Sequence, residues 1–234
     1  MKVDRPPVKL PSWDTSQRRS ITRPEEREAH PTLPAVRGSA LPLPPRRSGV
    51  WGHGRRAVIY RDAVTRSALV VLVPAAEPVV ATLRCSHDPM SGRGVPAHVT
   101  VLHPFRSVVD EETAAAVERL ASSMDAFTAT LARAGWFPGS VVFLEPEPVQ
   151  RFKDQTAATV EAFPDCPPYG GAFADPHPHL TVGNRVDEPT AQRIESILSP
   201  SLPIDFRVDR LTLLVEDDDG QWTVDRSWPL RVRS

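Results

Sequence analysis

The chain has 234 residues, which suffice for one sizeable hydrophobic core and do not require two independent domains. Its two cysteines, Cys85 and Cys166, cannot form a disulfide framework, and neither has the CxxC neighbour of a structural zinc site. Residues 1–66 carry 14 Lys and Arg against 6 Asp and Glu, whereas residues 67–234 carry 14 against 23. The acidic balance of the larger part argues against a protein that grips long nucleic acids through clustered cations.

Residues 1–56 predict a disordered tail that is rich in proline and arginine. Apolar periodicity is absent there, and the nine prolines deny the backbone the donors that helices and sheets need. A basic arm that contacts RNA is the functional alternative for this tail. The N-terminus lacks the apolar segment of a secretory signal, and no apolar run reaches the length of a membrane span. We therefore expect a cytoplasmic protein whose folded domain comprises residues 57–234.

Apolar patterning predicts alternating strands and helices in the folded part. Residues 56–60 fit either a short extra strand or the end of the tail. Further on, the sequence predicts strands over residues 67–74, 97–102, 126–135, 140–148, 179–183, 204–217 and 221–230, and helices over residues 78–84, 110–124, 149–162 and 189–198. The acidic runs at 145–148 and 216–219 are interpreted as solvated turns. This order indicates an α+β fold with mainly antiparallel sheets.

One short pattern, His, apolar residue, Thr, Val, occurs twice in the chain. It stands in "PAHVTVLHPF" with His98 and Thr100, and in "PHPHLTVGNR" with His179 and Thr181. Because side chains alternate faces along a strand, each His and Thr should point one way and the apolar residues the other. A helix is predicted after each motif strand, so the chain is expected to contain two related halves.

Two histidines and two threonines suit the cleavage of a phosphodiester bond. One histidine can take a proton from the attacking oxygen while the other protonates the leaving oxygen, since the unperturbed imidazole pKa lies near neutrality. Threonine hydroxyls can donate hydrogen bonds to the non-bridging phosphate oxygens and so stabilise the charge that develops there. This chemistry needs no cofactor, and no metal ion.

The paired motifs, about eighty residues apart, resemble the two-histidine phosphoesterase superfamily, which includes 2′-5′ RNA ligases and 2′,3′-cyclic phosphodiesterases. The segments "GVPAHVTVLHPF" and "FPDCPPYGGAFADPHPHLTVG" are similar to segments of the 2′-5′ RNA ligase family. The resemblance covers roughly residues 67–234. The resemblance implies a two-lobed fold whose sheets line a central cleft. It also implies that His98 and His179 are the acid–base pair and that Thr100 and Thr181 bind the phosphate. His103 departs from the resemblance, because an aromatic residue is expected at its position.

Several residues near the motifs have more than one interpretation. Tyr169, in a loop rich in proline and glycine, either anchors that loop or stacks on a base of single-stranded RNA. His177 and His179 form an H-x-H pair that could bind a metal ion if Asp175 or His103 supplied a third ligand. Local positive charge could come from three arginines, namely Arg84, Arg93 and Arg106.

The leading hypothesis is a metal-independent phosphodiesterase that opens 2′,3′-cyclic phosphates at RNA ends or on nucleotides. A reversible 2′-5′ RNA ligase is the alternative among enzymes, because a ribose hydroxyl can replace water as nucleophile. The alternative from another class is a protein that binds nucleotides or RNA ends without turnover. We expect a monomer that requires no protein partner.

Overall fold

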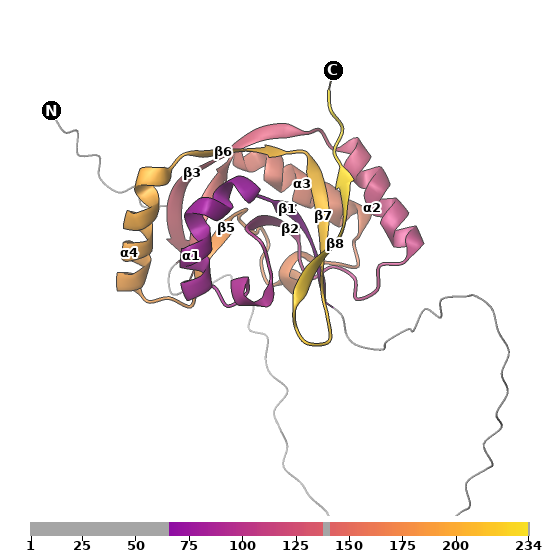
Figure 1. Ribbon diagram of the computed structural model, residues 1–234. Helices are drawn as coiled ribbons and strands as arrows, with labels where there is room; N and C mark the ends of the chain where they lie inside the picture. The colour runs from indigo at the N-terminus through magenta and orange to yellow at the C-terminus, as the bar shows by residue number, and fades with distance from the viewer. Residues whose placement is uncertain (1–65, 138–140, 234) are drawn as a thin grey trace, which may run out of the picture. The chain divides into compact units, whose positions relative to one another are not determined.

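The computed structural model of the protein describes residues 66–137 and 141–233 (Figure 1). The predicted tail, residues 1–56, and the strand-like residues 56–60 lie outside the described residues. The helices are α1 (Glu77–His87), α2 (Glu111–Ser123), α3 (Val149–Ala162) and α4 (Glu188–Leu198). The strands are β1 (Ser67–Leu72), β2 (His98–Leu102), β3 (Phe127–Phe137), β4 (Val141–Glu147), β5 (Leu180–Asn184), β6 (Ile204–Val208), β7 (Arg210–Glu216) and β8 (Trp222–Pro229).

The strands form two four-stranded sheets, with the orders β2-β1-β7-β8 and β5-β4-β3-β6. Every pairing within the two sheets is antiparallel, so the predicted two-lobed α+β fold is confirmed. β2 and β5, which carry the two motifs, each occupy the edge of a sheet, and these two edge strands pack against each other (Figure 1). Antiparallel edges from separate lobes therefore meet where the motifs lie.

The two halves repeat one order of elements. The first half runs β1-α1-β2-α2 and the second runs β4-α3-β5-α4, with the motif strand third in each. In both halves the motif strand pairs with the strand that begins the unit. The structure thus supports the prediction of two related halves, although their sequence similarity is confined to the motifs.

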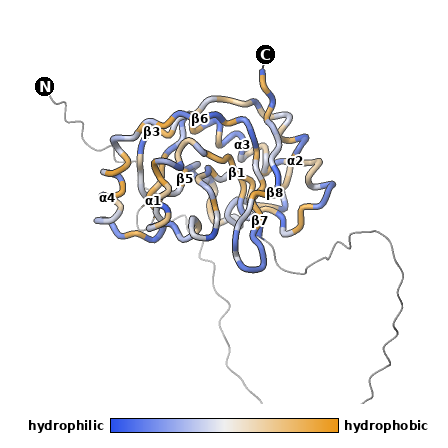
Figure 2. The backbone as a smooth tube through the Cα atoms, viewed as in Figure 1, coloured by the Kyte–Doolittle hydropathy of each residue, from blue (hydrophilic) through white to orange (hydrophobic). Residues whose placement is uncertain are grey.

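One large hydrophobic core joins the two sheets to the helices that cover them. Alternate residues of the central strands enter this core, among them Leu69 and Val71 of β1 and Leu144 of β4. The helices contribute one apolar stripe each, which Figure 2 shows as alternating apolar and polar stretches along α2 and α4. No helix within the described ranges is long and apolar enough to cross a membrane.

The helices that follow the motif strands begin with the same N-terminal cap. The Asp110 carboxylate accepts the Thr113 N–H at 2.8 Å before α2, and the Asp187 carboxylate accepts the Thr190 N–H at 3.0 Å before α4. These bonds satisfy one of the N–H groups that a helix leaves unpaired at its start. The aspartates that precede these two helices therefore have a specific structural role.

The prediction of one strand over residues 204–217 is wrong. The segment contains two strands that separate at Asp209, and β6 pairs with β3 whereas β7 pairs with β1. Both strands bury apolar residues, such as Phe206 and Leu211, so the apolar pattern runs across the break. Sheet membership depends on long-range pairing, which local periodicity does not specify.

The core contribution of the second motif strand can be measured directly. Leu180 is fully buried, so Leu180→Ala should lower the free energy of unfolding by about 2–5 kcal/mol through lost contacts and a residual cavity. Urea denaturation monitored by circular dichroism would measure this change. Val224→Ala is the control, because Val224 is 48% exposed and its truncation should change stability by less than about 0.5 kcal/mol.

Candidate active site

Both motif strands place their histidine and threonine on one face and their apolar residues on the other. Val99 and Leu180 are fully buried in the core, whereas the four motif side chains are only partly buried. The predicted alternation is therefore confirmed, although β5 begins at Leu180 and His179 lies just before it. We call the four side chains His98, Thr100, His179 and Thr181 the motif site.

A β-bulge follows the threonine in both motif strands. In β2 the pairing passes from Thr100 to Leu102, and in β5 it passes from Thr181 to Gly183. The skipped residues, Val101 and Val182, are both buried, which aims two successive residues of each strand at the core. Bulges redirect side chains next to functional sites, and this pair lies at equivalent positions.

Each motif histidine is held by a backbone carbonyl two residues upstream. His98 Nδ1 lies 2.7 Å from the carbonyl oxygen of Pro96, and His179 Nδ1 lies 2.7 Å from that of His177. A carbonyl can only accept a hydrogen bond, so Nδ1 must carry the proton in both rings. When either ring is neutral, its Nε2 is therefore left with the lone pair that a base needs.

Burial lowers the pKa of both motif histidines. For His98 the pKa falls to about 4, mainly by desolvation, while the bond to the Pro96 carbonyl opposes the fall. The positive charges of Arg84 and of His179 lower it further, and Asp88 raises it. Desolvation also lowers the pKa of His179. Both imidazoles are therefore neutral near pH 7 when no ligand is bound.

Aromatic rings support His179 on the second sheet. Phe137 and Phe143 stack on each other with centroids 4.4 Å apart, and both meet the His179 ring edge-on at 5.3 and 5.6 Å. Phe143 is fully buried and lies directly across from Thr181 in the sheet. This packing restricts the orientation of the imidazole in addition to the Nδ1 bond.

A second, smaller apolar cluster lies on the corresponding face of the first sheet. Val70 and Leu72 of β1 are opposite Thr100 and His98, and Val70 packs with Trp222 of β8. His103, where the family resemblance implies an aromatic residue, meets the Trp222 ring edge-on at 6.1 Å. The structure therefore provides an aromatic ring beside this position from another strand.

The loop that carries Tyr169 folds back onto the end of β2. The Tyr169 N–H donates to the His103 carbonyl at 2.6 Å, and its ring meets Phe173 edge-on at 5.6 Å. Burial raises the pKa of the Tyr169 hydroxyl, and a hydrogen bond with Thr100 opposes that rise. Tyr169 adopts a left-handed φ of 51°, which is uncommon for a residue with a side chain. The loop thus brings Tyr169 to the motif site.

A buried carboxylate beside the second motif was missed in the sequence. Residues 145–148 were predicted to form a solvated turn, but Glu145 lies in β4 and is only 3% exposed. Its carboxylate lies 3.2 Å from His177 Nε2 and 2.6 Å from Arg133 Nη2. The signal for this burial was Arg133 on β3, which lies opposite Glu145, because a buried carboxylate requires a partner of opposite charge.

The residues considered as metal ligands or as local positive charge have other partners. His177 faces Glu145, and the part of the chain that the structure describes contains no group of three His, Cys, Asp or Glu side chains arranged to hold a metal ion. Arg84 is buried and pairs with Asp88, Arg93 pairs with Glu216, and Arg106 pairs with Asp165. Glu216 is itself buried, which corrects the prediction that residues 216–219 are all solvated.

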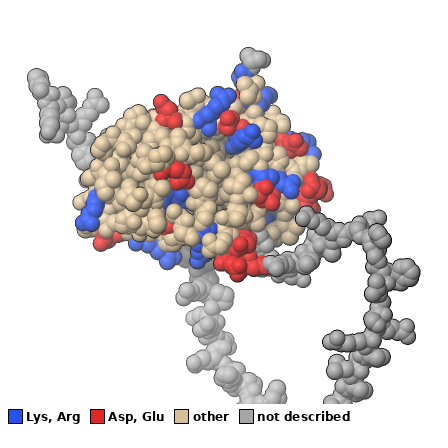
Figure 3. Space-filling model, viewed as in Figure 1, with Lys and Arg blue, Asp and Glu red and all other residues tan. Residues whose placement is uncertain are grey.

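Charges of both signs are mixed on the visible surface. Figure 3 shows Lys and Arg next to Asp and Glu on this face, and not gathered into a separate basic patch. The fold and the site together define a two-lobed α+β protein in which paired His-x-Thr strands meet at the edges of two sheets.

The chain belongs to the 2′-5′ RNA ligase superfamily, whose family model matches residues 72–220. This membership confirms the resemblance to the two-histidine phosphoesterases and supports a phosphoesterase or ligase enzyme in general. A comparison with curated proteins gave no match.

Three solved structures are similar over most of the described chain. E. coli LigT complexed with 3′-AMP shares 21% sequence identity, covering 71% of this chain and 98% of LigT, with a TM-score of 0.45. A phosphoesterase shares 21% identity, covering 72% and 99%, with a TM-score of 0.46. TT0787 of Thermus thermophilus shares 23% identity, covering 72% and 100%, with a TM-score of 0.45.

The pH dependence of stability tests the burial of His98. Its pKa is about 4 in the folded state against an ordinary value of 6.5, so the unfolded chain binds more protons between these values. The stability contributed by the buried, neutral His98 is therefore complete above pH 6.5, and it is lost as the pH falls through the folded-state pKa of about 4. His98→Gln cannot titrate and should lose less unfolding free energy than the wild type between about pH 7 and pH 5. Urea denaturation at both pH values measures this, and equal losses would contradict it.

Proposed function

We propose that this protein is a metal-independent phosphodiesterase that opens 2′,3′-cyclic phosphates at RNA ends or on nucleotides. The observation that carries the proposal is the matched geometry of the two motif histidines. Each has its Nδ1 occupied by a backbone carbonyl and its Nε2 left for proton transfer. Membership of the 2′-5′ RNA ligase superfamily supports the same class of reaction.

In the proposed reaction one imidazole takes a proton from water as the water oxygen bonds to phosphorus. The bond from phosphorus to one ribose oxygen breaks, and the other histidine, as its imidazolium, gives its proton to that oxygen. Both rings are neutral without ligand, so one must gain a proton when substrate binds. The anionic phosphate favours this, because a nearby negative charge raises the pKa of an imidazole. The first histidine then returns the proton that it took from water, so that the second histidine is again the imidazolium and the first is again neutral.

The threonines and Tyr169 have supporting roles in this proposal. The Thr100 and Thr181 hydroxyls would donate to the non-bridging phosphate oxygens, which gain charge as the new bond forms. Tyr169, hydrogen-bonded to Thr100, would place its ring beside a base attached to the ribose. This arrangement would orient one nucleotide at the motif site.

A reversible 2′-5′ RNA ligase remains the second candidate, since the same groups can activate a ribose hydroxyl. Ligation of two RNA strands requires a larger cationic surface, yet the arginines considered near the motifs are paired with carboxylates. This observation favours hydrolysis of a small substrate. A protein that only binds nucleotides would not require two proton-transfer groups, which disfavours the third candidate.

The decisive measurement is turnover of nucleoside 2′,3′-cyclic monophosphates by the full-length protein in the presence of EDTA. His98→Ala and His179→Ala should each lower kcat by about 10²–10⁴-fold, because each variant loses one proton-transfer group. His53→Ala, a histidine outside both motifs, is the matched control and should retain activity. Wild-type turnover that both motif variants preserve would contradict the proposed site.

Substitution of the two threonines separates phosphate binding from proton transfer. Thr100→Val and Thr181→Val keep the shape of the side chain and remove a hydroxyl donor. Each should lower kcat by about 10²–10³-fold, which is typical for loss of one donor to a developing oxyanion. The shape of the pH profile should stay unchanged, since the histidines remain. A loss confined to KM would mean that the hydroxyl contacts only the ground state.

Substitution of Tyr169 distinguishes its two possible roles, which are stacking on a base and anchoring the loop. If its ring stacks on the base, Tyr169→Ala should raise KM by about 5-fold or more, since base stacking contributes about 1–3 kcal/mol, and should leave the unfolding midpoint unchanged. Tyr169→Phe retains the ring and should keep KM near the wild-type value. A lower unfolding midpoint with an unchanged KM would instead identify Tyr169 as a loop anchor.

A further inference from the structure

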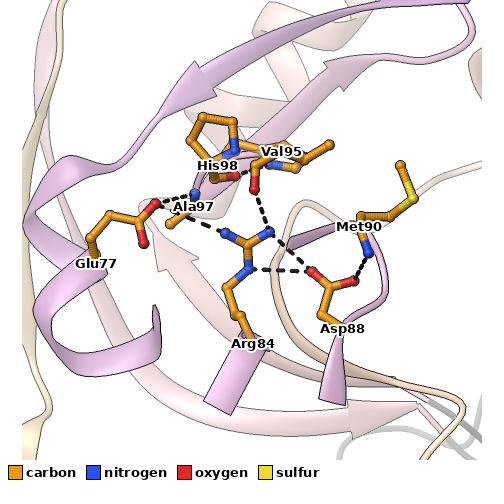
Figure 4. A network of polar contacts seen from close by, with 8 residues as sticks. Glu77, Arg84, Asp88, Met90, Val95, Ala97 and His98 are labelled. Atoms are coloured by element: carbon orange, nitrogen blue, oxygen red, sulfur yellow. Dashed lines mark hydrogen bonds and ion pairs between the residues drawn. The ribbon is translucent and has the colours of Figure 1, made fainter. Parts of the chain in front are cut away.

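The carbonyl that holds His98 lies in a segment that precedes β2. Pro96 has no N–H, so its carbonyl is its only backbone polar group, and His98 Nδ1 donates to it at 2.7 Å. The position of this carbonyl depends on the two peptide groups that flank Pro96. Both of these groups are bound by charged side chains of α1 (Figure 4).

Arg84 and Glu77 bind the two sides of Pro96. The Arg84 guanidinium donates from Nη2 to the Val95 carbonyl at 3.0 Å, and the Ala97 N–H donates to Glu77 Oε1 at 2.6 Å. The Ala97 carbonyl in turn accepts the Val73 N–H at 2.8 Å. The backbone is thus fixed before and after the residue whose carbonyl orients His98 (Figure 4).

Arg84 cannot reach a substrate in this arrangement. Its side chain is 2% exposed, and Asp88 accepts hydrogen bonds from its Nη2 at 3.0 Å and its Nε at 3.3 Å. Asp88 is also buried and accepts the Met90 N–H at 3.1 Å. Arg84, which the sequence offered as one possible source of local positive charge, is therefore connected to the backbone before His98 instead.

We propose that Glu77 and Arg84 are positioning residues that act on His98 through the Pro96 carbonyl. The hydrogen bonds that the structure describes for them go to the backbone at Val95 and Ala97 and to Asp88, and not to a motif side chain. Their effect is to hold the acceptor that keeps the His98 proton on Nδ1 and aims Nε2 at the motif site. The consequence for turnover rests on the proposed function, whereas the effect on the imidazole does not.

Glu77 gives the sharper test, because its side chain is 38% exposed and its substitution threatens folding less than that of buried Arg84. Glu77→Leu removes the acceptor of the Ala97 N–H, whereas Glu77→Gln retains an acceptor oxygen. The matched control is Glu118→Leu, which makes the same change at an exposed position of α2. All variants are made in the full-length chain.

The primary readout is the ¹⁵N NMR spectrum of the histidine side chains, which reports where the imidazole proton lies. In the wild type and in Glu77→Gln, the His98 signals should show a single neutral form protonated at Nδ1. In Glu77→Leu they should show a mixture of both neutral forms. Unchanged His98 signals in folded Glu77→Leu would overturn the proposal, whether or not the protein has activity.

Turnover of a 2′,3′-cyclic nucleotide is the second readout. Glu77→Leu should lower kcat about 10-fold, the lower end of the effect of outer-shell partners, with KM unchanged. Glu77→Gln should restore kcat to near the wild-type value. Unchanged kcat in Glu77→Leu, or an increase confined to KM, would overturn the positioning role. Absence of wild-type turnover would count against the proposed function alone, because the NMR result stands independently.

Discussion

The hydrogen bond from Nδ1 of each motif histidine to the carbonyl two residues upstream is the constraint on which the site depends. The bond takes the same form at His98 and His179, with a distance of 2.7 Å in both. It fixes the proton on Nδ1, so Nε2 of both rings has one defined role. An imidazole without this bond could rotate or change tautomer, and a paired acid–base site requires that neither does.

The position of the motif strands at the sheet edges follows from the same requirement. An edge strand pairs with only one neighbour in its sheet, and here the edge strands β2 and β5 of the two sheets contact each other. The apolar residues of both strands enter the shared core, and the equivalent bulges after Thr100 and Thr181 increase that burial. Core packing thus fixes one face of each motif strand, and the motif histidines and threonines lie on the opposite face.

The two histidines have similar geometry but different supports. The backbone before His98 is held by Glu77 and Arg84 of α1, whereas His177 before His179 is in contact with the buried Glu145. Buried charges are costly unless they are paired, and both Arg84 and Glu145 have ion-pair partners. The related halves therefore share their motif geometry and differ in the charged groups behind it.

Most elements of the fold could be predicted, because they depend on local patterns. The helix over 149–162 has the predicted bounds, and the strand over 204–217 was wrong only because its two parts join different sheets. The burial of Glu145 could not be predicted from local sequence. The "EPEP" run resembles a turn but continues β4, and Glu145 pairs with Arg133 across the sheet. Likewise, the sequence does not distinguish Arg84 from a surface arginine on a helix, and only the structure shows its contacts with Val95 and Asp88.

The sequence by itself determined the repeated His-x-Thr pattern, the alternation that separates polar from apolar residues and the class of chemistry that these residues suit. These properties depend on side-chain chemistry and on the two-residue period of a strand. Only the tertiary structure decided that the two motif strands meet, that a carbonyl fixes each imidazole and that buried ion pairs support the backbone beside it. Those contacts join residues far apart in the chain or depend on exact backbone geometry, which composition and periodicity do not encode.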